Sequence, residues 1–220
     1  MSKRSRRVAL IHATPVAVDP VMEAFRRLWP EAEPYNLLED SLASDLERAG
    51  GLDDAMVQRF RRLAGYAADC GADGILFTCS AFGPAIEAAA RDQAPRPVLK
   101  PNQAMFADAL ALGPRIAMVA TFAPSLAPME KEFADMAAAA GSPAQLTTVC
   151  VPDAMAALRS GDADAHNRLV ADAARDLGGC DAILLAQFST AKARDSVAAV
   201  ASVPVLTSPD SAVSLLRDRL

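Results

Sequence analysis

The chain repeats its own plan at a fixed offset of 108 residues, and this duplication constrains the fold more than any other feature. The segment GADGILFTCSA at residues 71–81 aligns without a gap with GCDAILLAQFS at residues 179–189. The same offset aligns RVALI at residues 7–11 with RIAMV at residues 115–119. Because solenoid repeats have periods of about 20 to 50 residues, a repeat of this length indicates a duplicated domain.

Length and composition fit two small lobes. A chain of 220 residues suffices for two near-minimal domains of about 100 residues each. Hydrophobic residues make up 52% of the chain and aromatic residues only 5%. A core rich in Ala, Val, Leu and Ile suits helices packed on parallel strands better than it suits a β-sandwich.

Short apolar runs alternate with longer amphipathic stretches, which is the pattern of βα units around a parallel sheet. The expected strands are residues 7–12, 33–37, 73–78, 97–99, 115–120, 146–151, 181–186 and 204–207. The expected helices are residues 18–28, 41–49, 53–70, 82–91, 102–111, 125–140, 153–159, 162–177, 190–200 and 209–219. Asp53 and Asp162 stand where two of these helices start.

The predicted fold class is α/β, with two pseudo-symmetric, flavodoxin-like lobes that each contain a parallel sheet. We expect residues 1–100 and about 204–220 to form the first lobe and residues 101–203 to form the second. Since the lobes are related by duplication, their corresponding loops are expected to converge, which predicts an active site between the lobes.

Charge, hydropathy and cysteine spacing exclude several classes of function. The net charge is −5 and the basic residues are dispersed, so no nucleic-acid partner is expected. No apolar run approaches the roughly 18 residues that cross a bilayer, which predicts a soluble, cytoplasmic protein without a membrane partner. The four cysteines lack C-x-x-C spacing and the two histidines lie far apart, so neither a metal site nor a disulfide framework is expected.

Ligands of open parallel sheets bind beyond the carboxyl ends of the strands, where loops turn into helices and present free backbone N–H groups. That rule selects the loops after four of the expected strands. The candidate binding residues in these loops are His12, Thr14, Ser80, Ala81, Thr121, Gln187, Phe188, Ser189 and Thr190, and the candidate catalytic residue is Cys79. Their amides and hydroxyls suit a small-molecule carboxylate.

Cys79 and Gln187 occupy equivalent positions of the repeat but differ in chemistry. A thiol that ends a strand and opens a helix sits in the positive field of the helix, which predicts a lowered pKa and an active thiolate for Cys79. The amide of Gln187 exchanges no proton near neutral pH, although it can donate to a carboxylate or an enolate oxygen. This asymmetry predicts that the thiol of Cys79 reacts on one face of a substrate, while only hydrogen bonds act on the other face.

The Asp73-x₅-Cys79 element, the matching Asp181-x₅-Gln187 element and the duplicated frame resemble the aspartate/glutamate/hydantoin racemase superfamily, which includes arylmalonate decarboxylase and maleate isomerase. The resemblance covers nearly the whole chain. It implies a cysteine at the end of each element and proton transfer at an α-carbon without cofactor or metal. Cys79 matches the first cysteine, whereas Gln187 stands where the second is expected, and this departure speaks against symmetrical two-base racemisation.

The expected function is therefore that of a cofactor-independent racemase- or isomerase-like enzyme that transfers a proton α to a carboxylate through Cys79. One alternative is a lyase similar to arylmalonate decarboxylase, and another is a carboxylate-binding protein that lost turnover together with the second cysteine. His12 is equally explained as a structural histidine, and His166 is expected to face solvent on its helix. A homo-oligomer is the default expectation.

Overall fold

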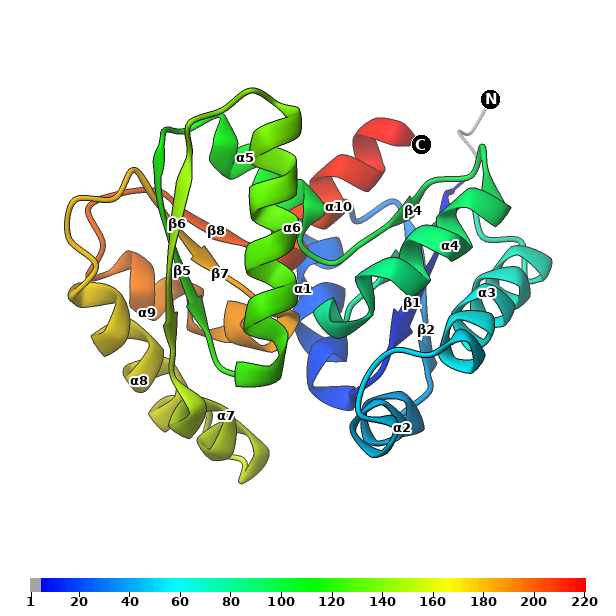
Figure 1. Cartoon of the computed structure of the whole chain (residues 1–220), viewed down its shortest axis with the longest axis horizontal. Helices are drawn as coiled ribbons and strands as arrows, with labels where there is room; N and C mark the ends of the chain where they lie inside the picture. The colour runs from blue at the N-terminus through cyan, green and yellow to red at the C-terminus, as the bar shows by residue number, and fades with distance from the viewer. Residues whose placement is uncertain (1–4) are drawn as a thin grey trace. The chain divides into compact units, whose positions relative to one another are not determined.

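The computed structural model describes residues 5–220, which form two compact α/β units (Figure 1). The first unit comprises the chain up to Pro101 together with Ala212–Leu220, and the second comprises Asn102–Ser211. Each unit contains a four-stranded parallel sheet, so the predicted α/β class with two related lobes is confirmed. None of the helices within residues 5–220 has both the length and the apolar character needed to cross a bilayer.

The first unit is built on a sheet with strand order β2-β1-β3-β4. Its strands are β1 (Arg7–His12), β2 (Glu33–Leu38), β3 (Gly74–Phe77) and β4 (Val98–Leu99). Its helical segments are η1 (Pro15–Ala17), α1 (Val18–Leu28), α2 (Ser41–Ala49), α3 (Asp54–Asp69), η2 (Ser80–Phe82), α4 (Gly83–Gln93) and the part of α10 (Ser208–Arg219) that follows Ser211. The side chain of Asp53 accepts a hydrogen bond from the Met56 N–H at 2.7 Å, as expected for a residue that caps α3.

The core of the first unit lies between the sheet and helices α3 and α4. Phe60 of α3 stacks on Phe77 of β3 with ring centroids 5.1 Å apart, and it contacts Phe82 at 4.8 Å. The last helix packs at the start of β3, because a Cβ atom on Gly74 would lie 2.9 Å from Leu220 Cδ1. A larger residue at position 74 would therefore require the Leu220 side chain to shift.

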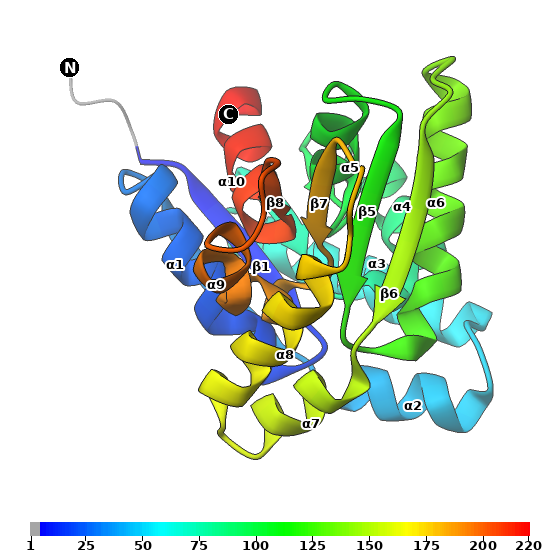
Figure 2. The same ribbon diagram turned by 90° about the vertical axis from the view of Figure 1, so that its left-hand side faces the viewer.

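The second unit repeats this topology with strand order β6-β5-β7-β8. Its strands are β5 (Arg115–Ala120), β6 (Gln145–Cys150), β7 (Ala182–Leu185) and β8 (Val205–Thr207). Its helical segments are α5 (Gln103–Leu110), η3 (Ala123–Ser125), α6 (Leu126–Ala139), α7 (Pro152–Arg159), α8 (Ala163–Arg175), η4 (Phe188–Ala193) and α9 (Arg194–Ala198). Figure 2 shows α6 on one side of β5 and β6 and α8 on the other.

The structure corrects two details of the expected organisation. The predicted helix at 190–200 is a 3₁₀ segment, η4, followed by the short helix α9. The boundary predicted near residue 204 lies instead between Ser211 and Ala212. The physical reason is that β8 pairs with β7, with Val205 opposite Ile183, so this strand belongs to the sheet of the second unit.

The aspartate of each repeat ties the first strand of its unit to the third. Asp73 Oδ2 accepts a hydrogen bond from the Arg7 N–H at 2.8 Å, and Asp181 Oδ2 accepts one from the Arg115 N–H at 2.9 Å. A Cβ atom on Gly113 would lie 2.6 Å from Asp181 Oδ2, which explains the glycine there. Both aspartates stand at the amino ends of the strands, so their repeated presence has a structural explanation.

Candidate functional site

Cys79 lies beyond the carboxyl end of β3, as predicted, and it precedes the 3₁₀ turn that leads into α4. The residue is only partly exposed. Burial raises the pKa of the Cys79 thiol above its usual value, and a hydrogen bond from the backbone N–H of Ala81 offsets part of this effect. The expected lowering of the pKa is therefore wrong: desolvation outweighs the positive end of the helix, which begins only at Gly83.

Thr14 follows β1, and Ser80 and Ala81 follow β3, so these three residues, here called the rim, stand with Cys79 beyond the carboxyl ends of two paired strands. Thr14, Ser80 and Ala81 are all partly exposed. Thr14 precedes η1 in an extended conformation, and its side chain forms no capping hydrogen bond. The rim therefore offers hydroxyl and backbone N–H groups beside a thiol.

His12 is fully buried at the end of β1, and both of its ring nitrogens have protein partners. Its Nδ1 lies 2.8 Å from Thr78 Oγ1, and its Nε2 lies 2.9 Å from Asn36 Oδ1. Burial lowers the pKa of His12, although the hydrogen bond with Asn36 opposes the shift. The structure therefore favours the structural explanation of His12, because no ring nitrogen is left for a substrate.

Gln187 lies in the second unit at the position that corresponds to Cys79, and its amide is fully engaged. Its Oε1 accepts hydrogen bonds from the backbone N–H and the hydroxyl of Thr121, both at 2.9 Å. Its Nε2 donates to Ser125 Oγ at 2.6 Å and to the carbonyl of Phe122 at 3.2 Å. The expected role of this amide as a donor to a bound carboxylate is therefore not supported, since neither amide proton is free.

The backbone of Gln187 is unusual as well. It adopts φ 74° and ψ 138°, and among the described residues it is the one residue other than glycine with a positive φ. Such a conformation costs on the order of 1–3 kcal/mol and persists only where the surroundings enforce it. The hydrogen bonds of the side chain hold the residue in this conformation.

The other candidates of the second unit are part of the same buried cluster. Thr190 Oγ1 lies 3.4 Å from both Thr121 Oγ1 and Gln187 Oε1. Phe188 and Ser189 are buried beside them. The structure thus places the predicted residues of this unit close to two neighbouring strand ends, and it turns the polar side chains of Thr121, Gln187 and Thr190 toward one another.

Sequence reasoning missed several polar residues at these strand ends. Thr78 and Asn36 hold His12, and Ser125 holds Gln187. Asn102 Oδ1 accepts from Ser208 Oγ at 2.7 Å, while its buried Nδ2 has no hydrogen-bond partner among the described residues. Only their position after or beside a strand could have singled these residues out.

Two further expectations concern residues outside these clusters. His166 is fully buried on α8, so the prediction that it faces solvent is wrong. Burial lowers its pKa, and its Nδ1 lies 2.9 Å from Asn167 Oδ1. Among residues 5–220, no cluster of three or more His, Cys, Asp or Glu side chains could hold a metal ion.

Comparison with known proteins identifies the family to which this geometry belongs. Residues 20–216 match the family model described as Asp/Glu/Hydantoin racemase. This chain is a member of that family. A comparison with curated proteins found no match.

Solved structures of racemases share the fold. Glutamate racemase from Francisella tularensis matches with a TM-score of 0.72 and 12% identity, over 98% of this chain and 81% of that one. Allantoin racemase from Klebsiella pneumoniae matches with a TM-score of 0.70 and 18% identity, over 97% and 87%. Aspartate racemase from Picrophilus torridus matches with a TM-score of 0.68 and 13% identity, over 98% and 94%. At these identities the likeness establishes the fold, and family membership supports a racemase- or isomerase-like function.

Proposed function

We propose that this racemase-family member is an isomerase-like enzyme that moves a proton at the carbon α to a carboxylate, with Cys79 as its only reacting thiol. The observation that carries the proposal is the position of Cys79, a partly exposed residue beyond the end of β3, next to the partly exposed rim of Thr14, Ser80 and Ala81. Racemase-family membership supports the class of reaction. A small carboxylate is the proposed substrate class, and the reaction needs no cofactor.

Within this proposal, the rim residues bind the substrate and Cys79 performs the chemistry. The hydroxyls of Thr14 and Ser80 donate to the carboxylate. The negative charge that develops on the enolate is stabilised by the same donors. Thr121, Thr190 and Gln187 are left out of substrate binding, because their polar groups are bound to one another.

A lyase similar to arylmalonate decarboxylase is the second candidate, and the pKa of Cys79 favours it. Burial raises this pKa, so the resting residue is a neutral thiol near pH 7. A neutral thiol is ready to donate a proton, whereas proton removal first requires a thiolate. In the lyase reaction the C–C bond of a malonate-like acid breaks and releases carbon dioxide. Its electron pair becomes the enolate, and the Cys79 S–H proton is then added to the α-carbon.

Incubation with amino acids, hydantoins and substituted malonates in D₂O tests both candidates. We expect α-deuteration or carbon dioxide release that disappears in Cys79→Ala and persists in the matched variant Cys150→Ala, which removes the thiol of the last residue of β6. Deuteration of both enantiomers supports the isomerase, and carbon dioxide release with a product labelled in one configuration supports the lyase. Turnover that survives in Cys79→Ala would disprove the role of this thiol.

A further inference from the structure

One buried imidazole connects three neighbouring strands of the first unit. His12 ends β1 and contacts Asn36 of β2 through Nε2, at 2.9 Å. It contacts Thr78, the residue after β3, through Nδ1 at 2.8 Å. Thr78 directly precedes Cys79. His12 therefore contacts the residue next to the one that carries the thiol.

The partners of His12 determine its tautomer. Asn36 Oδ1 can only accept a hydrogen bond, so Nε2 of His12 carries the proton. Nδ1 then accepts, and the hydroxyl of Thr78 donates to it. If both ring nitrogens carried protons, the Thr78 hydroxyl would have to donate to the Ile11 carbonyl, which is 3.4 Å away and therefore a poor acceptor. The neutral imidazole is the form that satisfies both contacts.

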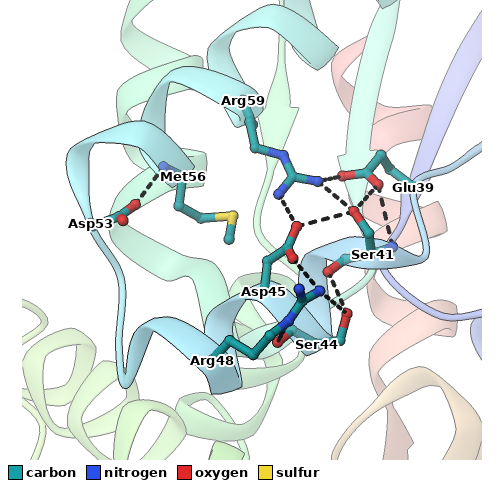
Figure 3. Close-up of polar contacts among 8 residues, drawn as sticks. All are labelled: Glu39, Ser41, Ser44, Asp45, Arg48, Asp53, Met56 and Arg59. Atoms are coloured by element: carbon teal, nitrogen blue, oxygen red, sulfur yellow. Dashed lines mark hydrogen bonds and ion pairs between the residues drawn. The ribbon is translucent and has the colours of Figure 1, made fainter.

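The loop that follows β2 is anchored to His12 and to α3. The backbone N–H of Glu39 donates to the His12 carbonyl at 2.9 Å. The carboxylate of Glu39 accepts from the hydroxyl of Ser41 at 2.6 Å and pairs with Arg59, which also binds Asp45 (Figure 3). This network holds the loop that follows β2, the edge strand whose Asn36 contacts His12.

We propose that His12 is a positioning residue for Cys79, because its two hydrogen bonds hold the end of β3 and with it the turn in which the Ala81 N–H meets the Cys79 sulfur. The significance for catalysis rests on the proposed function of Cys79. His12 has no free nitrogen for a substrate, so its loss changes the reactivity of the thiol and lowers kcat more than it raises KM.

Alkylation of Cys79 by iodoacetamide tests this inference without a substrate. His12→Phe keeps a buried flat ring but removes both hydrogen bonds, and Thr78→Val removes one of them with little change of shape. His12→Gln restores one donor and one acceptor. Rates are measured by mass spectrometry of the modified peptides over a range of pH, and the internal controls are Cys70, Cys150 and Cys180.

We expect His12→Phe and Thr78→Val to slow the alkylation of Cys79 about threefold or more near neutral pH, because a lost Ala81 contact lowers the thiolate fraction. His12→Gln should recover most of the rate. The inference is overturned if both folded variants leave the Cys79 rate unchanged, or if all four cysteines change together. If His12→Phe does not fold, Thr78→Val still tests the inference.

The same variants separate this inference from the proposed function. If the alkylation rate of Cys79 responds to His12 and Thr78 but Cys79→Ala keeps full turnover, the positioning contact stands and the catalytic assignment fails. If Cys79→Ala abolishes turnover while the alkylation rates and kcat of the His12 and Thr78 variants match wild type, the catalytic assignment of Cys79 stands and the positioning role of His12 fails.

Discussion

The two units share one topology but treat the end of their third strand in opposite ways. In the second unit, β7 leads to Gln187, whose amide is bound by Thr121, Ser125 and a backbone carbonyl. In the first unit, β3 leads to Cys79, which stays partly exposed beside a rim of small polar residues. The strand end of the second unit is closed by contacts among its own side chains, whereas Cys79 in the first unit remains partly exposed.

The residues at the end of the first strand explain part of this difference. Thr121 follows β5 and provides both an N–H and a hydroxyl to Gln187. The equivalent position of the first unit is Ala13, which has no polar side chain to engage Cys79. The polar contact between strands in the first unit lies one residue earlier, between His12 and Thr78. A duplicated frame can thus preserve its strand order while the residues at equivalent strand ends make different contacts.

Replacement of Cys79 should have the largest effect on activity. A positioned acid or base contributes about 10²- to 10⁴-fold to a rate, so Cys79→Ala should lower kcat by at least two orders of magnitude. Gln187→Ala should keep much more activity, because its amide touches only the protein. Steady-state kinetics of the two variants measure these losses, with the substrate that the incubation in D₂O identifies. Equal losses of kcat in the two variants would contradict the proposal that the reacting residue lies in the first unit.

Replacement of Gln187 should have the largest effect on stability. Gln187→Ala leaves the buried N–H of Thr121 without its acceptor, which should cost about 1–3 kcal/mol in the free energy of unfolding. Gln145→Ala is the matched control, since Gln145 is exposed on β6. Urea unfolding measures both. Gln187→Gly should lose less of the free energy of unfolding than Gln187→Ala, because glycine tolerates the positive φ of this position. The reverse order would show that the backbone of Gln187 is not strained.

Each unit also contains one buried histidine that should make stability depend on pH. Burial lowers the pKa of His12 and of His166 below the usual value of about 6.5. The unfolded chain therefore takes up protons first, so this contribution to stability is complete above about pH 6.5 and is lost as the pH falls from there through the lowered values. Unfolding measured between about pH 7.5 and 5.5 should show this loss, and His12→Gln should reduce its slope. A slope that is unchanged in that variant would contradict the shift at His12.

The smallest expected effects concern the two helix caps. Asp53 caps α3 in the first unit, and Asp162 caps α8 in the second through a hydrogen bond from the Ala165 N–H at 2.8 Å. Loss of such a cap costs about 1 kcal/mol, so Asp53→Ala and Asp162→Ala should each lower the free energy of unfolding by about that amount. Because the Asp53 contact is the less exposed of the two, its loss should cost more. Thermal unfolding of the two variants compares them.

Much of the fold followed from local patterns. The predicted strand at residues 115–120 has those bounds as β5, and the helix predicted at 41–49 has those bounds as α2. These elements follow from hydrophobic periodicity, which a sequence displays directly. The expected placement of the active site between the lobes stays a prediction, as do the cytoplasmic location and a homo-oligomer.

The candidate site was predicted in position but not in its contacts. The rule that ligands bind beyond strand ends selected the loops of Cys79 and Gln187, and the structure places both residues after the ends of β3 and β7. Ligand binding by these loops stays a prediction. The rule did not reveal that Ser125 would bind Gln187, or that Asn36 would bind His12, because these partners lie 62 and 24 residues away in the chain.

The sequence by itself determined the duplicated α/β frame, its strands and the position of a single thiol where the family resemblance implies two, because these features reside in local periodicity and in residue identity. Only the tertiary structure decided the state of those residues. It turned Gln187 and Thr121 toward each other and raised the pKa of Cys79 through burial. Hydrogen-bond partners and desolvation depend on which distant segments meet, and folding brings those segments together.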